Sequence, residues 1–195
     1  MSYSITRHKP RDGASTFGVK DSSETTNVIS LQSYSAELSG VTEYISGMSS
    51  NRNTLSTANG LVDLQEYSNS HSMWNRASFR EISGLSGEGT GTLVSYESVI
   101  YSGHYLSHDG STLFLKKRTS DLNFDASATF VKHSALSTVG GDLSLECANK
   151  LGSYLTRDAY NGGVRVVSRM KELESSDFFS KAATWYRKPG LGLSG

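Results

Sequence analysis

The sequence has little of what marks several specialised classes of protein. Its single cysteine, Cys147, excludes an intramolecular disulfide and hence a disulfide-stapled secreted scaffold. No apolar run is long enough to span a membrane, and the opening residues MSYSITRHKPRDG lack the apolar segment of a secretory signal. We therefore expect a cytoplasmic protein without a membrane span, although non-classical export or trimming of a longer chain would leave the same pattern.

An excess charge of either sign is also missing. Lysine plus arginine and aspartate plus glutamate both number 19, so the net charge is zero and no broad field attracts nucleic acid. The five histidines form no set with cysteine or carboxylates at metal-ligand spacing, and no nucleophile, base and orienting group can be assembled. We expect no nucleic-acid partner, no metal, no cofactor and no catalytic residue. Cys147, within LSLECANK, is read as a buried structural thiol.

Glycine and tyrosine are plentiful, at 19 and 10 residues, whereas proline occurs only twice and charged residues make up 19% of the chain. This composition is typical of short strands joined by tight turns and is unlike that of a helical bundle. It predicts an all-β protein.

A short motif occurs three times, as ASFREISGL, ATFVKHSAL and ATWYRKPGL. Each copy has alanine, a hydroxyl residue and an aromatic residue, followed six positions later by leucine, and the aromatic residues are Phe79, Phe130 and Trp185. A tyrosine followed by an aliphatic residue precedes every copy, in EYIS, HYLS and SYLT. Such recurrence indicates three structural repeats, with the aromatic residues and tyrosines in equivalent core positions.

Each repeat reads as four short strands, which gives about twelve strands in the chain. Single repeats of this size cannot bury their apolar faces, so three must share one core, with six strands closed into a barrel and three hairpins capping it. We predict a β-trefoil over residues 28–195, with repeats at about 28–86, 92–137 and 142–192. Residues 1–27 are expected to form a flexible or loosely docked arm, and MKELESSDFFS a helical turn.

The segment SYESVIYSGHYLSHDGSTLFLKKRTSDLNFDASATFVKHSAL resembles one repeat of the arabinose-binding domain of fungal α-L-arabinofuranosidase B, a β-trefoil carbohydrate-binding module. The resemblance covers residues 28–191. It implies pockets, one per repeat, in which a histidine and an aspartate bind arabinofuranose. The histidine position falls on Gly47, His108 and Arg157 in the three repeats. The aspartate position falls on Arg76, Ser127 and Ala182.

The resemblance makes the middle repeat the best candidate pocket, with His108, Asp109 and Ser127, and with Asp125 as a carboxylate that could substitute for the missing aspartate. Arg157 and Asp158 form the nearest alternative in the third repeat, or else a surface ion pair. Trp74 and Tyr101 have no counterparts in the other repeats and are candidate exposed contacts.

Two functions follow from these observations. The first is a non-catalytic, lectin-like recognition module whose partner is a glycan or a pentose-containing saccharide. The alternative is a protein–protein interaction scaffold, in which the trefoil is kept, sugar binding is lost and the partner is a protein.

Overall fold

The computed structural model describes residues 27–47, 59–87, 92–158, 163–169 and 176–193. The predicted arm at residues 1–27 lies outside these ranges apart from Asn27. The strands are β1 (Val28–Ser33), β2 (Glu43–Gly47), β3 (Asn59–Glu66), β4 (Phe79–Ser83), β5 (Leu93–Ser98), β6 (His104–His108), β7 (Leu113–Lys117), β8 (Phe130–Ser134), β9 (Leu143–Cys147), β10 (Ser153–Arg157), β11 (Val164–Ser168) and β12 (Trp185–Pro189). The helices are α1 (Tyr34–Glu37), α2 (His71–Arg76), α3 (Leu122–Ser127), α4 (Ser176–Ala182) and the 3-10 turn η2 (Leu191–Leu193).

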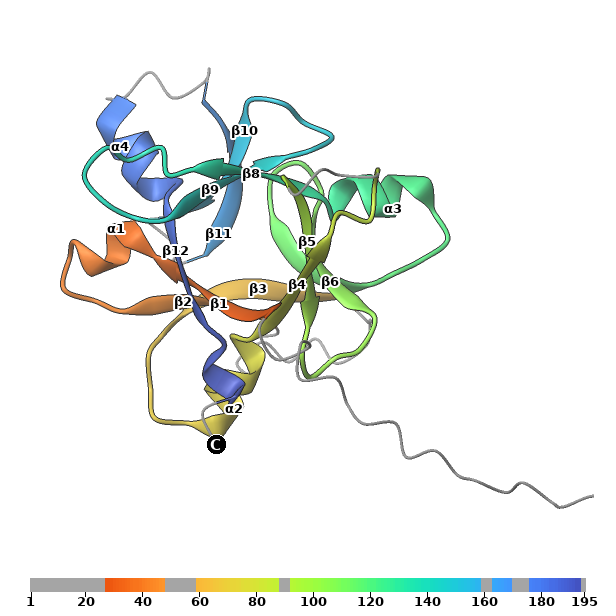
Figure 1. Ribbon diagram of the computed structural model, residues 1–195, viewed down its shortest axis with the longest axis horizontal. Coiled ribbons are helices and arrows are strands. Elements are labelled where there is room, and N and C mark those ends of the chain that lie inside the picture. Colours follow the sequence, from red (N-terminus) through yellow and green to blue (C-terminus); the bar gives the residue numbers. More distant parts are fainter. Residues whose placement is uncertain (1–26, 48–58, 88–91, 159–162, 170–175, 194–195) are drawn as a thin grey trace, which may run out of the picture.

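Six of the strands close into a barrel. Antiparallel pairing runs from β1 to β4, β5, β8, β9 and β12 and returns from β12 to β1. The ring lies at the centre of the view in Figure 1, with the loops and short helices around it. A closed ring leaves none of these six strands with a free edge, which removes a template for aggregation.

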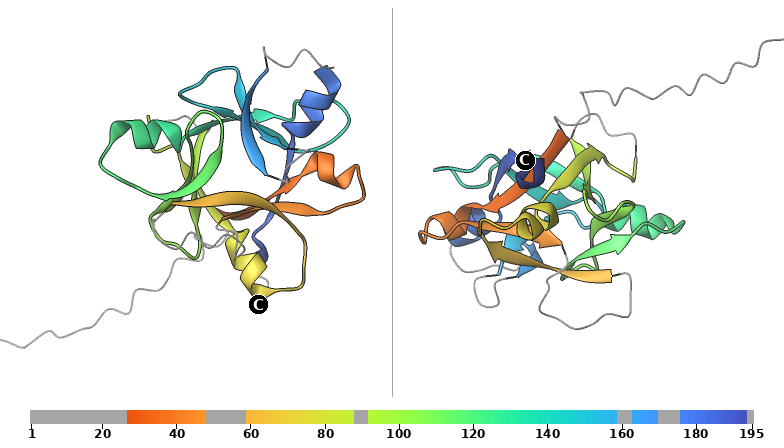
Figure 2. Two further views of the ribbon diagram at one scale, coloured as in Figure 1. Left: turned by 180° about the vertical axis from the view of Figure 1, so that it is seen from behind. Right: turned by 90° about the horizontal axis from the view of Figure 1, so that it is seen from below.

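The other six strands form three hairpins, β2–β3, β6–β7 and β10–β11, which gather at one end of the barrel (Figure 2). Strand β3 pairs with β7, and single bridges join Asp63 to Gly163 and Thr112 to Arg165, so all three hairpins meet. A six-stranded barrel capped by three hairpins is a β-trefoil, which confirms the predicted fold. We call β1–β4, β5–β8 and β9–β12 lobes 1, 2 and 3. No helix among the described residues is long and apolar enough to cross a membrane.

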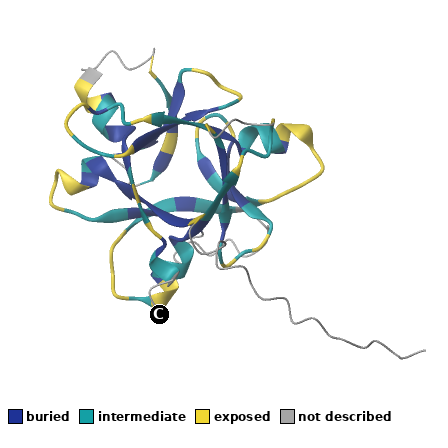
Figure 3. Ribbon diagram, viewed as in Figure 1, coloured by how far each residue is buried: buried dark blue, intermediate teal, exposed yellow. Residues whose placement is uncertain are grey.

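The repeated aromatic residues meet in the shared core. Phe79, Phe130 and Trp185 have no exposed surface and belong to one apolar cluster, as predicted. Buried residues concentrate on the barrel and exposed residues on the outer loops (Figure 3). Hairpin register places Gly47 opposite Val62, His108 opposite Leu113 and Arg157 opposite Val164, so the sequence alignment of the three repeats matches their geometry.

The repeated tyrosines do not fill the barrel. Each belongs to a small cluster outside it, together with a helix residue and the leucine that ends the preceding lobe. These sets are Tyr44 with Met73 and Leu191, Tyr105 with Phe124 and Leu85, and Tyr154 with Phe179 and Leu136. The tyrosines are buried packing residues at equivalent positions, as predicted, but they join these three smaller clusters because a helix lies between the hairpin and the closing strand and needs apolar partners of its own.

Those helices, α2, α3 and α4, precede the closing strand in every lobe. Only the third was expected from the sequence. The three are six or seven residues long, too short for a helical period to be recognised. In α3, Asp121 is the N-cap, and its side chain accepts a hydrogen bond from the Asn123 amide.

The hydroxyl residue of the motif ties neighbouring lobes together. Ser78, Thr129 and Thr184 each donate to a carbonyl in the helix of their own lobe, at 2.8, 2.8 and 2.7 Å. Each also accepts a backbone N–H from the residue after the leucine of the preceding lobe, at 2.8, 3.0 and 3.0 Å. The amides of the leucines themselves donate to a second set of buried hydroxyls on the first strands, Ser30, Ser95 and Ser144.

A second set of equivalent residues forms an ion cluster on the barrel strands, partly open to solvent. Glu81, Lys132 and Arg187 each follow the closing aromatic residue by two positions and so share its face of the strand. Lys132 Nζ lies 3.0 Å from one carboxylate oxygen of Glu81, and Arg187 Nε lies 3.6 Å from the other. The buried Tyr96 hydroxyl also donates to Glu81, at 3.2 Å, so one carboxylate serves all three lobes.

Replacing Thr184 with valine should test the lobe-to-lobe hydrogen bonds. The side chain keeps its shape, but the buried Ser137 amide and Ser180 carbonyl lose a partner, so the free energy of unfolding should fall by about 1–3 kcal/mol in urea denaturation. Thr92→Val is the matched control, because Thr92 is exposed, and should change stability by less than about 0.5 kcal/mol. Equal stabilities of the two variants would contradict this account.

Candidate functional site

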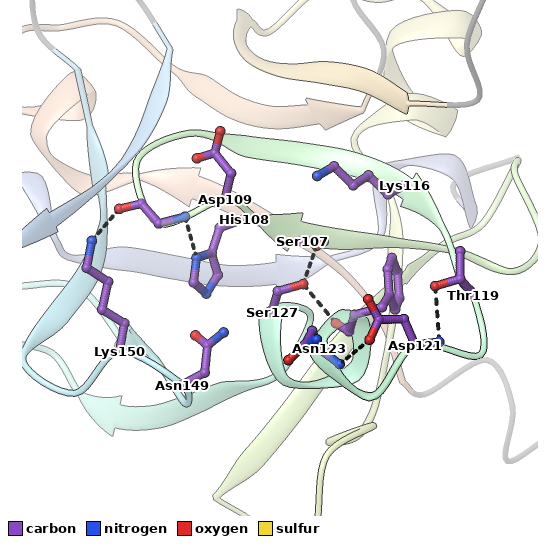
Figure 4. Close-up of a pocket in the computed structure, with 12 residues that line it drawn as sticks. Ser107, His108, Asp109, Lys116, Thr119, Asp121, Asn123, Ser127, Asn149 and Lys150 are labelled. Atoms are coloured by element: carbon purple, nitrogen blue, oxygen red, sulfur yellow. Dashed lines mark hydrogen bonds between the residues drawn. The ribbon is translucent and has the colours of Figure 1, made fainter.

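A cavity of about 440 Å³ opens between lobes 2 and 3, and we call it the middle-lobe cavity. Lobe 2 provides the end of β6, the hairpin turn and helix α3, while lobe 3 provides the loop between β9 and β10. Its walls are mostly polar or charged (Figure 4). The lining residues are Ser107, His108, Asp109, Gly110, Lys116, Thr119, Asp121, Asn123, Phe124, Ser127, Asn149 and Lys150.

His108 ends β6 and is only 5% exposed, with its ring 6.1 Å from that of Phe130. Its Nδ1 accepts a hydrogen bond from the Gly110 amide at 3.0 Å. Burial lowers the pKa of His108; the nearby Asn149 side chain opposes this shift and the Lys150 charge adds to it. A neutral imidazole that accepts at Nδ1 carries its proton on Nε2. Among the described residues no group lies in hydrogen-bond geometry with Nε2, although the Asn149 side chain is close enough to favour the protonated ring. His108 is therefore a buried donor at the cavity wall, with Asn149 beside it.

Asp109 shapes the turn that follows His108. Its Oδ1 accepts hydrogen bonds from the Ser111 amide, the Ser111 hydroxyl and the Thr112 amide, at 2.9, 2.9 and 2.8 Å. Burial tends to raise the pKa of Asp109, but these hydrogen bonds together hold it below its usual value. The side chain is exposed at the cavity rim and is ionised at neutral pH.

Ser127 lies in the cavity, as the sequence predicted, but Asp125 does not. The Ser127 hydroxyl donates to the Phe124 carbonyl and lies 2.8 Å from the Ser107 hydroxyl. Asp125 instead forms a bidentate pair with Arg118, at 2.9 and 2.7 Å. Residues two apart on a helix point to nearly opposite sides, so Asp125 cannot take the place of a carboxylate at Ser127.

Arg157 and Asp158 do not pair with each other. Arg157 Nε donates to Glu43 at 2.8 Å, across the interface between lobes 3 and 1. Asp158 is buried, with Oδ2 3.6 Å from Arg165 Nη1. The two candidates of the third repeat therefore take part in separate ion pairs, and Arg157 lines a cavity.

That second cavity, of about 250 Å³, is the counterpart of the first, and we call it the third-lobe cavity. Arg157 takes the position of His108, and Ala182 takes that of Ser127. Its lining residues are Ser35, Leu38, Ser39, Arg157, Phe178, Lys181 and Ala182. Leu38 and Phe178 are 56% and 53% exposed, so this cavity is more apolar than the first.

Several lining residues were missed by the sequence analysis. Asn149 and Lys150 come from the next lobe, and Lys150 Nζ donates to the Gly110 carbonyl on the opposite wall. In the third-lobe cavity, Ser35 and Leu38 likewise come from the first loop of the next lobe in the ring. The threefold arrangement would have indicated this loop, but nothing in the loop sequence itself does.

Three other predicted roles can be placed. Trp74 packs in the lobe 1 cluster and its Nε1 donates to the Ser68 carbonyl at 2.9 Å, while Tyr101 packs against the main core. Both serve packing, which corrects the expectation of exposed contacts. Cys147 is fully buried, and burial raises its pKa to about 12, as befits a structural thiol. Within the described ranges, no group of three or more histidine, cysteine or acidic side chains could hold a metal ion.

The family follows from a comparison with known domain families. The model of the alpha-L-arabinofuranosidase B (ABFB) domain matches residues 45–186, well over half of the chain. The chain belongs to this family. The AbfB match includes every residue that lines the middle-lobe cavity, whereas Ser35, Leu38 and Ser39 of the third-lobe cavity precede it. No curated protein matched the sequence.

Solved structures support the fold. An arabinofuranosidase complexed with arabinofuranosyl-alpha-1,2-xylobiose superimposes with a TM-score of 0.66 at 21% identity, over 85% of this chain and 31% of that one. This chain thus spans less than a third of the enzyme's length. The β-trefoil lectin of the Vibrio vulnificus hemolysin/cytolysin, with N-acetyl-D-lactosamine bound, gives a TM-score of 0.54 at 12% identity, over 84% of this chain and 95% of that one.

The neutral state of His108 predicts how stability varies with pH. Because its pKa is lowered in the folded protein, the unfolded chain binds the proton more readily. The contribution of neutral His108 to the free energy of unfolding is therefore complete above about pH 6.5. It is lost as the pH falls towards and through the pKa of His108 in the folded protein. His108→Gln should lose less stability than the parent protein between pH 7.5 and 5 in urea denaturation.

His104→Gln, at the other end of β6, is the matched control for loss of a histidine. An NMR titration of the His108 ring should give a midpoint below about 6.5. A midpoint at or above that value would show that His108 is not held in the neutral state.

Proposed function

We propose that the chain is a non-catalytic carbohydrate-binding module whose ligand occupies the middle-lobe cavity. The observation that carries the proposal is His108. It stands at the histidine position of the resembled repeat, buried in the wall of a polar cavity, and its Nε2 donor has no partner in hydrogen-bond geometry among the described residues. A buried donor without a partner costs about 1–3 kcal/mol, which a ligand acceptor would recover.

The rest of the cavity suits a small polyhydroxylated ligand. Sugar hydroxyls both donate and accept, so they need side chains of both kinds at close range. Asp109 and Asp121 supply acceptors, Asn149 and Lys150 supply donors, and Phe124 adds an apolar surface. A pocket of 300–1,000 Å³ is usual for small ligands, and about 440 Å³ accommodates one or two sugar rings.

Pentose-containing saccharides are the first class to test, because the AbfB family and the arabinofuranosidase complex both connect this fold with arabinofuranose. The three lobes differ at the sugar-contact positions of the resembled repeat. Only lobe 2 keeps the histidine, and none keeps the aspartate. A single cavity of this kind predicts weak binding of a glycan. Binding becomes stronger when several copies of the module bind the same polysaccharide.

The third-lobe cavity favours a second function, a protein-interaction scaffold. Leu38 and Phe178 present apolar surface beside it, and Arg157 is held by Glu43 rather than left available for a sugar. A protein partner would use this apolar surface, whereas a glycan would use the middle-lobe cavity. Loss of partner capture in Leu38→Ser, with glycan binding intact, would separate the two functions.

Glycan binding should depend on His108. On a glycan array and in calorimetry with an arabinoxylan oligosaccharide, His108→Ala should weaken binding roughly tenfold or more, as expected for a lost buried hydrogen bond. His108→Gln keeps an N–H donor and should restore part of the affinity. His104→Ala lies on the same strand outside the cavity and is the control.

Thermal unfolding of each variant separates loss of the ligand contact from loss of the fold. No binding of any glycan by the parent protein, or equal binding by parent and His108→Ala, would refute the proposal.

A further inference from the structure

One end of the middle-lobe cavity is rich in hydrogen-bond donors. His108, Asn149 and Lys150 stand together there (Figure 4). Among the described residues His108 Nε2 has no partner in hydrogen-bond geometry, and Lys150 Nζ carries three N–H groups, one of which reaches the Gly110 carbonyl. Asp109 stands beside His108, but its Oδ1 already accepts three hydrogen bonds from the hairpin turn. The donors of His108 and Lys150, together with the Asn149 amide, suit a ligand group that accepts.

The position that would supply an acceptor has changed. The resemblance puts an aspartate at Ser127, where a carboxylate would accept from sugar hydroxyls. The Ser127 proton goes to the Phe124 carbonyl, and the hydroxyl also contacts Ser107. The floor therefore carries no negative charge, and a neutral sugar would lack the carboxylate acceptor that the family pattern expects there.

The opposite end of the cavity differs. Thr119, Asp121 and Asn123 lie there, and Asp121 uses Oδ1 to cap α3 through the Asn123 amide. Among the described residues nothing occupies Asp121 Oδ2, so this oxygen can accept a sugar hydroxyl. Lys116, from β7, lies 4.5 Å from the Phe114 ring and has no carboxylate within ion-pair distance in the described ranges.

The charge of the cavity decides what kind of anion fits. The net charge of its lining is zero, because the two carboxylates, Asp109 and Asp121, balance the two ammonium groups, Lys116 and Lys150. A phosphate, with up to two charges and few donors of its own, would meet two carboxylates that it cannot satisfy. A monoanion that also carries hydroxyls can use the lysine end and the aspartate end together.

We infer that the middle-lobe cavity binds an acidic saccharide, a uronic acid residue, with its carboxylate against His108 and Lys150 and its hydroxyls towards Asp121. This inference rests on the proposed function and names its ligand class. Carboxylate acceptors make short, charge-assisted hydrogen bonds with ammonium donors such as the exposed Lys150, while the buried His108 supplies a neutral donor beside it.

The test is a comparison of three small glycosides by NMR titration of the full chain. Methyl β-D-glucuronide and methyl β-D-glucoside differ only in the carboxylate, and methyl α-L-arabinofuranoside represents the neutral pentose. We expect the glucuronide to bind at least tenfold more tightly than the glucoside, with the largest shifts at His108 and Lys150. Its affinity should fall as salt is raised, because the pair is partly exposed.

Substitutions identify the side chain that binds the carboxylate of the glucuronide. Lys150→Gln should weaken glucuronide binding roughly tenfold and leave the glucoside unchanged. Lys117→Gln, whose side chain leaves β7 on the opposite face from Lys116, is the charge-matched control and should behave as the parent. Ser127→Asp adds a negative charge to the floor and should weaken the glucuronide while favouring the arabinofuranoside.

The outcomes separate the inference from the proposed function. Tighter binding of the arabinofuranoside than of the glucuronide at this cavity would overturn the inference and leave the carbohydrate-binding proposal standing. Glucuronide binding that Lys150→Gln does not weaken would also overturn it. Failure of all three glycosides and of the arabinoxylan oligosaccharide would remove both.

Discussion

The fold depends on one hydrogen-bonding arrangement repeated three times. The hydroxyl between alanine and the aromatic residue joins a helix of its own lobe to the chain leaving the preceding lobe. Thr129, for example, bonds the Asp125 carbonyl and the Ser86 amide. The leucine of the same motif then completes the neighbouring lobe's tyrosine cluster. The aromatic residue fills the shared core, the alanine packs in its own lobe's tyrosine cluster and the leucine in the next lobe's, so no lobe can form its set of contacts alone.

This arrangement fixes the cavities as well. Because each helix is held to its own closing strand and to the preceding lobe, its outer face stands at a set distance from the hairpin end. The first loop of the next lobe closes the remaining side. The backbone therefore offers equivalent cavities, and the residues at a few positions decide what each can bind. His108 and Ser127 make one cavity polar, while Arg157 and Ala182, with Leu38 and Phe178 nearby, make its counterpart more apolar.

The barrel and its core could be predicted because repetition reveals equivalent positions without any knowledge of contacts. Phe79, Phe130 and Trp185 were recognised in this way, as was His108. The helices α2 and α3 could not, since six residues hold too few turns to show a period. Nor could the direction of Asp125, which depends on that helix, or the presence of Asn149 and Lys150, which belong to another lobe. Contacts between repeats follow from the three-dimensional ring and leave no mark within any one repeat.

The ion cluster of Glu81, Lys132 and Arg187 has a consequence for the ancestry of such a chain. Three identical copies of a single repeat would place the same side chain at all three positions, either three carboxylates or three cations in mutual repulsion. A cluster of mixed charge therefore requires unlike residues in the three lobes. Divergence among the copies is thus a condition of this cluster, and exchanging one lobe for another would undo it.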